Sequence, residues 1–233
     1  MSSLRTGLIF VISAPSGGGK SSLCQRLLNW SPNLIYSVSC TTRAPRGGEQ
    51  DGRDYFFLTP AEFERRIARD DFLEYAQYNG HYYGTPRQFI EDQLAVGKDV
   101  LLDIEVQGAG QVIRRVRSGM FAYPDALVTI FLMPPSLELL EARLRRRGTD
   151  SDETIQKRLT LAEREMAHWR EYDYVILSGS MDDDFAQGKS IFIAEKCRTS
   201  RQPQEHPWRQ KELLPRMLQA GQIGGNTKRK THR

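Results

Sequence analysis

One glycine-rich segment of the chain has the residue types and the spacing that bind phosphate. It is Ala14–Ser21, with the sequence APSGGGKS. Glycines let backbone N–H groups approach phosphate oxygens closely, and the start of a following helix adds a positive dipole. In this pattern Lys20 reaches the β- and γ-phosphates of a nucleoside triphosphate, and the Ser21 hydroxyl ligates Mg²⁺. The general pattern has glycine where this chain has Ala14, a departure at one position.

A carboxylate downstream is expected to join this phosphate site. Asp103 lies in the apolar run DVLLDI, at residues 99–104. Ligands bind at the carboxyl ends of parallel strands, so this side chain is expected to face the phosphate loop. There it either holds Mg²⁺ through water or contacts the acceptor nucleotide. An aspartate at a strand end is more often a helix cap, but the phosphate loop upstream favours a functional role.

Two groups of arginines are candidates for the positive charge that phosphoryl transfer requires, since its catalysis is mostly positioning and charge stabilisation. Arg143 and Arg147 lie four residues apart on one helical face, and Arg158 follows on the next helix. The glycine-containing stretch between these helices is typical of a hinged lid, although a solvated basic face explains the three arginines equally well. The second group lies in RAPRGGE, residues 43–49, where arginine suits bidentate phosphate contacts.

Residues downstream of that second group could complete an acceptor site. Tyr55 and Tyr83 could add phenolic hydroxyls to the arginine charge. Glu74 stands among apolar neighbours in FLEY. A carboxylate there could accept from two adjacent N–H groups, the pattern that guanine presents at N1 and its 2-amino group. A strand-surface glutamate is the alternative interpretation of Glu74.

The elements that must position these groups follow from hydrophobic periodicity. Short apolar strand candidates alternate with helical segments, which indicates βαβ units and an α/β fold with a mainly parallel sheet covered on both faces. The predicted strands are 7–13, 34–40, 99–104, 127–133 and 174–177. The predicted helices are 21–30, 86–96, 107–116, 137–147, 153–172 and 182–197.

One region breaks this alternation. Residues 43–83 are polar and aromatic, with strand-like pieces at 55–58 and 72–78 around one helix. That helix opens on a capping box, Thr59–Glu62, with proline at its first position. We interpret the region as a small α+β insertion between core elements.

Composition excludes several classes of protein. The 233 residues are 39% hydrophobic and 27% charged, enough for one globular domain with a small inserted subdomain. No apolar run approaches the roughly 20 residues that span a bilayer, and the polar segment Met1–Thr6 does not resemble a signal peptide, so no membrane partner is expected. Cys24, Cys40 and Cys197 are scattered, which argues against a disulfide framework or a zinc site and fits a cytoplasmic location.

The net charge of +4 comes from the carboxyl-terminal end. Between Arg201 and Arg233 there are eight Lys/Arg and two Asp/Glu, so the first 200 residues hold 25 of the 33 basic and 27 of the 29 acidic residues. The basic cluster at 228–230 is short and terminal, and nucleic-acid binding is therefore not expected. Residues 201–233 are expected to form a basic, disordered tail.

Together these motifs resemble the guanylate kinase family from about Leu8 to about Cys197. The segments that carry the resemblance are 39–46 (SCTTRAPR), Gly48, Glu49, Asp54, Tyr55, 72–76 (FLEYA), 82–85 (YYGT), 102–108 (LDIEVQG), 134–136 (PPS) and the arginine-containing lid. The resemblance implies a cytoplasmic ATP:GMP phosphotransferase that uses Mg²⁺ and moves the ATP γ-phosphoryl group to GMP, and to dGMP. It leaves the oligomeric state open.

The resemblance also implies roles for individual residues. The catalytic residues are Lys20, Arg143, Arg147 and Arg158. The ATP-binding residues are Ala14, Pro15, Ser16, Gly17, Gly18, Gly19, Lys20, Ser21 and Ser22. The GMP-binding residues are Ser39, Arg43, Arg46, Glu49, Tyr55, Glu74, Tyr83, Gly84, Thr85 and Asp103. The resemblance implies that Ser21 ligates Mg²⁺ and that Asp103 binds it through water.

The fold implied by the resemblance has three parts that close over both substrates and exclude water. They are a P-loop kinase core with a parallel sheet flanked by helices, an inserted α+β GMP-binding subdomain and a helical lid. The core is expected at about 4–42, 86–136 and 170–200, the insertion at about 43–85 and the lid at about 137–169.

The chain departs from the family pattern in three places, and one of them is the segment after about residue 200, to which nothing in the family pattern corresponds. Thr85 also opens a possible capping box, TPRQ, so its hydroxyl is a candidate cap for the next helix. After the strand at 174–177 the family usually has an Asn-Asp pair that helps to hold adenine, whereas this chain has Ser178 and Gly179. That difference leaves the adenine contacts and the selectivity for ATP open.

Two other functions compete with this interpretation. One is a catalytically inactive, guanylate-kinase-like binding module, which the presence of Lys20 and the lid arginines disfavours. The other is a phosphate-loop kinase for another nucleotide or a phosphorylated sugar. Glu74 with Ser39 favours guanine over adenine, because adenine has no N1–H for a carboxylate to accept.

Overall fold

The structure is a computed structural model that describes residues 6–78, 80–146 and 151–202. Its core is a five-stranded sheet in the order β2-β7-β1-β8-β9, in which all neighbours are parallel. The strands are β1 (Ile9–Ser13), β2 (Leu34–Tyr36), β7 (Asp99–Asp103), β8 (Leu127–Met133) and β9 (Tyr174–Leu177). The predicted α/β class with a parallel sheet is confirmed.

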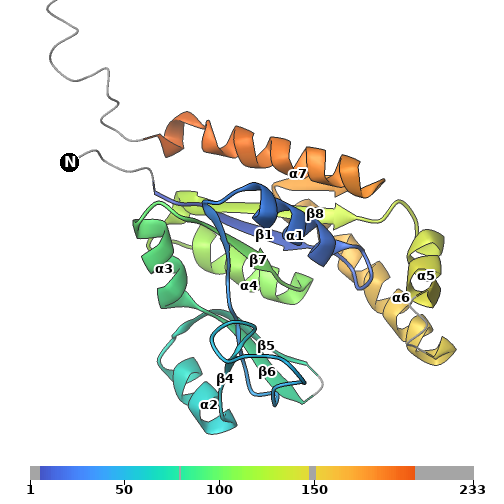
Figure 1. Ribbon diagram of the computed structural model, residues 1–233, viewed down its shortest axis with the longest axis horizontal. Helices are drawn as coiled ribbons and strands as arrows, with labels where there is room; N and C mark the ends of the chain where they lie inside the picture. Colours follow the sequence, from blue (N-terminus) through green and yellow to red (C-terminus); the bar gives the residue numbers. More distant parts are fainter. Residues whose placement is uncertain (1–5, 79, 147–150, 203–233) are drawn as a thin grey trace, which may run out of the picture.

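Helices cover both faces of this sheet (Figure 1). One face carries α1 (Lys20–Trp30) and α7 (Met181–Lys196), and the other carries α3 (Arg87–Ala95) and α4 (Val106–Arg117). The strands are apolar on both faces, so alternate residues of β1 enter different cores. Phe10 and Ile12 pack with Leu23, Leu27 and Phe192, whereas Ile9 and Val11 pack with Ile90, Leu94 and Val112.

A second, four-stranded sheet lies beyond the α3 and α4 face of the core (Figure 1). Its strands are β3 (Cys40–Thr41), β4 (Phe56–Phe57), β5 (Phe72–Tyr78) and β6 (His81–Pro86), in the order β4-β3-β6-β5. One helix, α2 (Pro60–Ala68), covers it through Phe63, which stacks on Phe72. As predicted, Thr59 caps α2, because its hydroxyl accepts from the backbone N–H of Glu62 at 3.2 Å.

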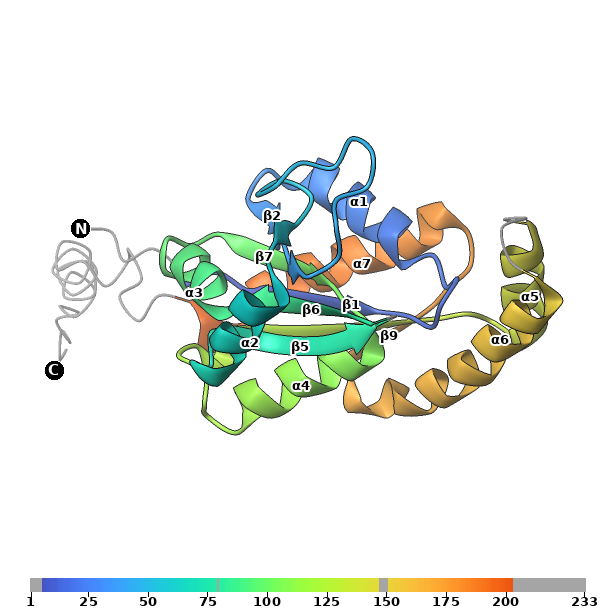
Figure 2. The same cartoon turned by 90° about the horizontal axis from the view of Figure 1, so that it is seen from below.

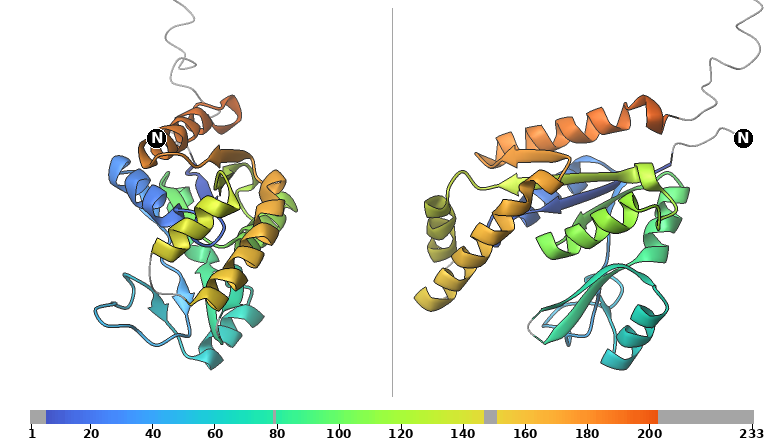
Figure 3. Two further views of the ribbon diagram at one scale, coloured as in Figure 1. Left: turned by 90° about the vertical axis from the view of Figure 1, so that its right-hand side faces the viewer. Right: turned by 180° about the vertical axis from the view of Figure 1, so that it is seen from behind.

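Two helices, α5 (Leu137–Arg146) and α6 (Asp152–Met166), extend past the carboxyl ends of the core strands (Figure 2). They pack on one another through a small apolar core of Leu140, Leu144, Ile155 and Ala162. Figure 3 shows this helical pair projecting from the sheet, separate from the second sheet.

The structure corrects two of the predicted elements and adds one strand. The strand predicted at 34–40 is two short strands in different sheets, because the chain leaves the core after Tyr36 and enters the second sheet at Cys40. The helix predicted at 153–172 ends at Met166 and continues as a 3₁₀ turn, η2 (Ala167–Glu171). That turn redirects the chain so that Tyr172 enters the core against Phe131. The strand β6 was not predicted.

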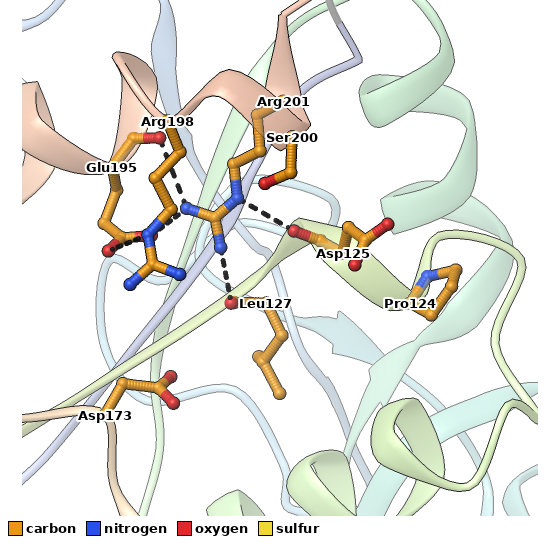
Figure 4. Close-up of a pocket in the computed structure, with 8 residues that line it drawn as sticks. All are labelled: Pro124, Asp125, Leu127, Asp173, Glu195, Arg198, Ser200 and Arg201. Carbon is orange, nitrogen blue, oxygen red and sulfur yellow. Dashed lines mark hydrogen bonds and ion pairs between the residues drawn. The ribbon is translucent and has the colours of Figure 1, made fainter.

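The end of the described chain is attached to the core. A 3₁₀ turn, η3 (Thr199–Arg201), follows α7 and lies beside another, η1 (Pro124–Ala126). The guanidinium of Arg201 pairs with the buried carboxylate of Glu195 and donates to the carbonyl oxygens of Asp125 and Leu127 (Figure 4). The tail predicted for 201–233 lies outside the described residues from 203 onward. In the described part of the chain, no helix is long and apolar enough to cross a membrane.

Candidate active site

The phosphate loop lies between β1 and α1, as predicted. Gly17 and Gly19 have φ of 90° and 94°, a backbone region that side chains with a Cβ rarely adopt. A Cβ on Gly18 would lie 2.9 Å from both the Ala14 methyl carbon and the Pro15 carbonyl oxygen, so the loop is too tight there for any other residue. Ala14, which replaces the usual glycine, is buried and packs in the core without disturbing this turn.

Lys20 lies between two carboxylates at this loop. Its ammonium is 2.6 Å from Asp103 Oδ1 and 3.9 Å from Glu105 Oε1. Burial alone lowers the pKa of Lys20, but the two carboxylates outweigh it and hold that pKa above its usual value. The pairing of β1 with β7 brings these groups together, since Ile12 lies opposite Asp103 in the register. The expectation that Asp103 faces the phosphate loop is therefore met.

The helical pair contacts the same loop. A Cβ on Gly17 would meet Leu140 and Leu144 of α5 at 3.2 and 2.9 Å, so α5 packs directly on the loop backbone. Near the end of α6, the Glu165 carboxyl interacts with the Ser16 backbone, and its Oε2 is buried without a hydrogen-bond partner among the described residues. Burial, followed by the charge of Glu105, raises the pKa of Glu165 to about 7.

The predicted lid arginines lie on these helices where the structure describes them. Arg143 Nη1 lies 3.5 Å from the Ser178 hydroxyl, just after β9. Arg158 is half-buried on α6. Arg147 lies outside the described residues. Ser178, which replaces the usual asparagine, donates to the buried Asp184, so the chain after β9 is held by α7.

A second basic cluster forms in the loop between β3 and β4. The Arg43 guanidinium makes two hydrogen bonds to Glu49, at 3.0 and 2.9 Å, and lies over the Tyr55 ring at 5.4 Å. Glu49 also accepts from the backbone N–H of Arg46 at 2.7 Å, and the Arg46 side chain is exposed. The Tyr55 and Tyr83 rings meet edge to face at 6.1 Å. Glu49 thus organises the two arginines, and its carboxylate is already occupied by them.

Glu74 is buried, which overturns the strand-surface alternative. Its side chain lies between β6 and α4, and its exposed fraction is 7%. The Thr85 hydroxyl donates to Oε1 at 2.6 Å. Burial raises the pKa of Glu74, opposed by the hydrogen bonds from Thr85.

Thr85 does not cap the helix that follows it. The residue at the start of α3 is Pro86, with no side-chain cap, so the capping-box interpretation of Thr85 was wrong. The physical reason is that Thr85 lies inside β6, where its buried hydroxyl points to Glu74. The neighbouring Gly84 is also buried, and a Cβ there would meet Phe63 and Phe72 at 3.0 Å. Ser39, half-buried, precedes β3 and accepts a backbone hydrogen bond from Phe56.

Sequence reasoning did not identify several residues of this region. Burial raises the pKa of the phenol of Tyr36, at the end of β2, and the nearby Asp103 and Tyr55 raise that pKa further. Glu165 had no signal beyond its place on an amphipathic helix. Gly108 of α4 lies against Glu74, and Gln111 of α4 bonds to Tyr75. These contacts depend on the packing of α4 on β5, which the sequence does not reveal.

A pocket at the other end of the sheet does not belong to this site. It is lined by the residues drawn in Figure 4, where β8 begins. Glu195 in its wall pairs with both Arg201 and Arg198, and Asp173 pairs with Arg117 outside the pocket. Ligands of parallel sheets bind at the opposite, carboxyl end of the strands, where Lys20 and Asp103 lie.

Comparison with known proteins agrees with this geometry. The guanylate kinase family model matches residues 7–195. A guanylate kinase of Desulfitobacterium hafniense is 47% identical over 197 residues, which cover 84% of this chain and 94% of that protein. One of Maricaulis maris is 44% identical over 208 residues and 88% of each chain. The crystal structure of a guanylate kinase from Anaplasma phagocytophilum has a TM-score of 0.66 and 34% identity, covering 93% of this chain and 95% of that one. The chain therefore belongs to the guanylate kinase family.

Proposed function

We propose that the residues of this site transfer the γ-phosphoryl group of ATP to GMP, as expected of a guanylate kinase. A GMP phosphate oxygen forms the new bond to phosphorus while the bond to the β–γ bridging oxygen breaks, giving ADP and GDP. One observation carries the proposal. Lys20 of the phosphate loop and the buried carboxylate of Glu74 both lie beside the first turn of α4, just after β7.

The ATP side consists of the phosphate loop, Lys20 and the lid. Backbone N–H groups of residues 14–22 would hold the phosphates, and Lys20 would exchange its pairing with Asp103 for the β- and γ-phosphate oxygens. Arg143, Arg147 and Arg158 would neutralise the charge on the transferring group as α5 and α6 close. The contact of α5 with Gly17 supports a lid that moves together with the loop.

The donor groups at the loop fit magnesium bound chiefly through substrate phosphates. Ser21 supplies a hydroxyl, and Asp103 supplies a carboxylate that is 12% exposed at the end of β7. No cluster of three or more metal-binding side chains occurs in the part of the chain that the structure describes, and Mg²⁺ in kinases needs only one or two protein ligands. Mg²⁺ would be held by Ser21, with Asp103 through water, and would offset phosphate charge when bound.

The GMP phosphate would bind at the basic cluster of the second sheet. Arg43 and Arg46 supply charge, and the Tyr55 and Tyr83 hydroxyls would add hydrogen bonds. We infer that Glu49 positions Arg43 rather than contacting phosphate, since its two oxygens already accept from Arg43 and Arg46. Direct contact between that carboxylate and a phosphate dianion would be repulsive.

The guanine base would be recognised by Glu74, with Thr85 and Ser39 beside it. The two oxygens of an ionised carboxylate can accept from N1–H and from the 2-amino group together. The hydroxyl of Thr85 orients Oε1 and still leaves lone pairs on both oxygens. Adenine presents an acceptor at N1, so AMP would meet the carboxylate with an unfavourable contact.

An inactive binding module is the alternative function. It would need neither a paired lysine in the phosphate loop nor a lid packed on that loop, and this chain has both. The small-molecule partners are therefore ATP and GMP, in a chain that we expect to act in the cytoplasm without nucleic acid.

The test is Mg²⁺- and ATP-dependent ADP formation with GMP, dGMP, IMP, AMP, CMP and UMP. Activity with the guanine nucleotides, weaker activity with IMP, which lacks the 2-amino group, and none with AMP would support both the chemistry and the role of Glu74. A Lys20→Met control should lower kcat on the order of 10²–10³-fold while GMP binding persists. Equal use of AMP and GMP would reject the base-recognition role, and undiminished turnover by Lys20→Met would reject the catalytic one.

A further inference from the structure

Helix α4 lies directly against the strand that carries Glu74. At Gly108, on the first turn of the helix, an added Cβ would lie 2.8 Å from Glu74 Oε2 and 3.3 Å from its Cδ. A real Cβ does not approach a carboxylate oxygen so closely, so either the carboxylate or the helix would have to move. Glycine inside a helix is unfavourable relative to alanine, yet here its missing side chain makes room for the carboxylate.

One turn further along, the same helix holds the backbone of β5. Gln111 Nε2 donates to the Tyr75 carbonyl oxygen at 2.7 Å, and Gln111 Oε1 accepts from the Tyr75 N–H at 3.2 Å. β5 is the edge strand of its sheet, so these two bonds satisfy backbone groups on the side that has no neighbouring strand. The residue after Glu74 is thereby fixed to α4.

These contacts connect the two substrate sites through one rigid element. The residue before α4 is Glu105, whose carboxylate lies 3.9 Å from Lys20. Gly108 and Gln111 follow at helical spacing, and their contacts fall on Glu74 and on the next residue of β5. The place of the carboxylate relative to the phosphate loop is thus set by α4 as well as by Thr85.

We propose that Gly108 and Gln111 are positioning residues for guanine recognition, and that they act by fixing where the Glu74 carboxylate lies. This inference rests on the proposed role of Glu74. A carboxylate that accepts two parallel hydrogen bonds tolerates little displacement, so pushing it by about one ångström weakens the bonds to the base. Contacts to ATP, made on the other side of the site, are unaffected.

The test is Gly108→Ala, with Gly110→Ala as its matched control. Both changes add one methyl to α4 and favour the helix equally, but a Cβ on Gly110 meets only the flexible end of Arg114, at 3.3 Å. We expect Gly108→Ala to raise the GMP Kd, measured by calorimetry, and the KM for GMP by about tenfold or more, with the KM for ATP within about twofold. Gly110→Ala should leave all three within about twofold. A Gly108→Ala enzyme with unchanged GMP affinity overturns the inference.

Two further variants separate this inference from the proposed function. In a Glu74→Ala background, Gly108→Ala should have no added effect on GMP affinity, because the group on which it acts is gone. Gln111→Leu should lower the affinity for GMP several-fold and leave the melting temperature of the protein nearly unchanged. If Glu74→Ala weakens GMP but Gly108→Ala and Gln111→Leu do not, only the inference fails. If Glu74→Ala itself leaves GMP affinity intact, the proposed guanine recognition fails.

Discussion

The carboxyl group of Glu165, on the lid helix α6, lies beside the phosphate loop and has a raised pKa. Its surroundings are Glu105 from the start of α4, Lys20 from α1, His168 from η2 and the Ser16 backbone. Burial and Glu105 raise the pKa of this carboxyl, whereas Ser16, Lys20 and His168 lower it, and the result is about 7. Near neutral pH, the junction between lid and loop therefore exists in both charge states.

This pKa predicts how stability depends on pH. Between the ordinary glutamate value of 4.5 and about 7, the folded chain binds a proton at Glu165 that the unfolded chain has lost. The contribution of Glu165 to the free energy of unfolding therefore falls as pH rises through this range. Glu165→Gln removes that dependence. We expect the wild type to lose stability relative to Glu165→Gln from about pH 4.5 to 7, as measured by urea unfolding at a series of pH values. Parallel curves for the two proteins would contradict the assignment.

At the scale of single residues, the sequence predicts those that belong to a local motif. The phosphate-binding pattern of the loop Ala14–Ser21 consists of consecutive residues, so the sequence alone predicts it. The positive φ angles of Gly17 and Gly19 agree with the predicted turn. Thr85 shows the limit, since its local pattern fits a helix cap equally well and only the burial of Glu74 decides between the two. Gly108 has no local signal, because its role depends on a side chain 34 positions away.

At the scale of elements, the apolar runs predicted most of the core, and the errors lie in the polar insertion and where the chain changes sheet or direction. Strand β8 lies where predicted, since a continuous apolar run is typical of a buried parallel strand. The edge strand β9 also lies where predicted, although Val175 and Leu177 are exposed. β6 escaped prediction because it mixes aromatic with small residues and contains Gly84, whose place depends on Phe63 and Phe72. The single strand predicted at 34–40 failed because periodicity does not show a change of sheet.

The lid offers a test of how one element supports another. Leu144 of α5 is fully buried and packs between Gly17 of the phosphate loop and Ile155 of α6. Leu144→Ala would remove about 2–5 kcal/mol of packing, because the small core of the lid has little else to fill the space. We expect faster hydrogen exchange in α5 and α6 and a larger rise in the KM for ATP than in that for GMP.

The exposed Leu139 is the matched control, since it lies on the same helix with 41% of its surface accessible. Leu139→Ala should leave exchange in the lid and both KM values close to those of the wild type. If the two variants behave alike, α5 does not support the phosphate loop in the way that the packing at Gly17 implies.

At the scale of the whole molecule, the sequence predicts a folded domain up to residue 200 and a tail from residue 201. The contacts of Arg201 and Gln202 test that boundary. We propose that the folded body includes Arg201 and Gln202 and does not end at residue 200. Arg201 pairs with Glu195, whose side chain is 3% exposed, and donates to two backbone carbonyl groups near the start of β8. Gln202 donates to the carbonyl oxygen of Lys196 at 2.7 Å. No local pattern marks the contacts of Arg201 with Asp125 and Leu127, because these residues lie about 75 positions apart in the chain.

Two truncations that differ by two residues test this boundary. A chain that ends at Gln202 keeps the contacts of Arg201 with Glu195, Asp125 and Leu127, and it should match the full chain in melting temperature and turnover. A chain that ends at Ser200 leaves the buried Glu195 with two partners among the residues that the structure describes, the partly exposed Arg198 at 2.9 Å and the hydroxyl of Tyr174. Removing one partner of a buried ion pair costs about 3–5 kcal/mol, somewhat less here because Arg198 remains. We expect the shorter chain to melt several degrees lower in thermal scans, with its KM values unchanged wherever it is folded, because the pair lies at the end of the sheet opposite to the site. Equal melting temperatures would return the boundary to residue 200.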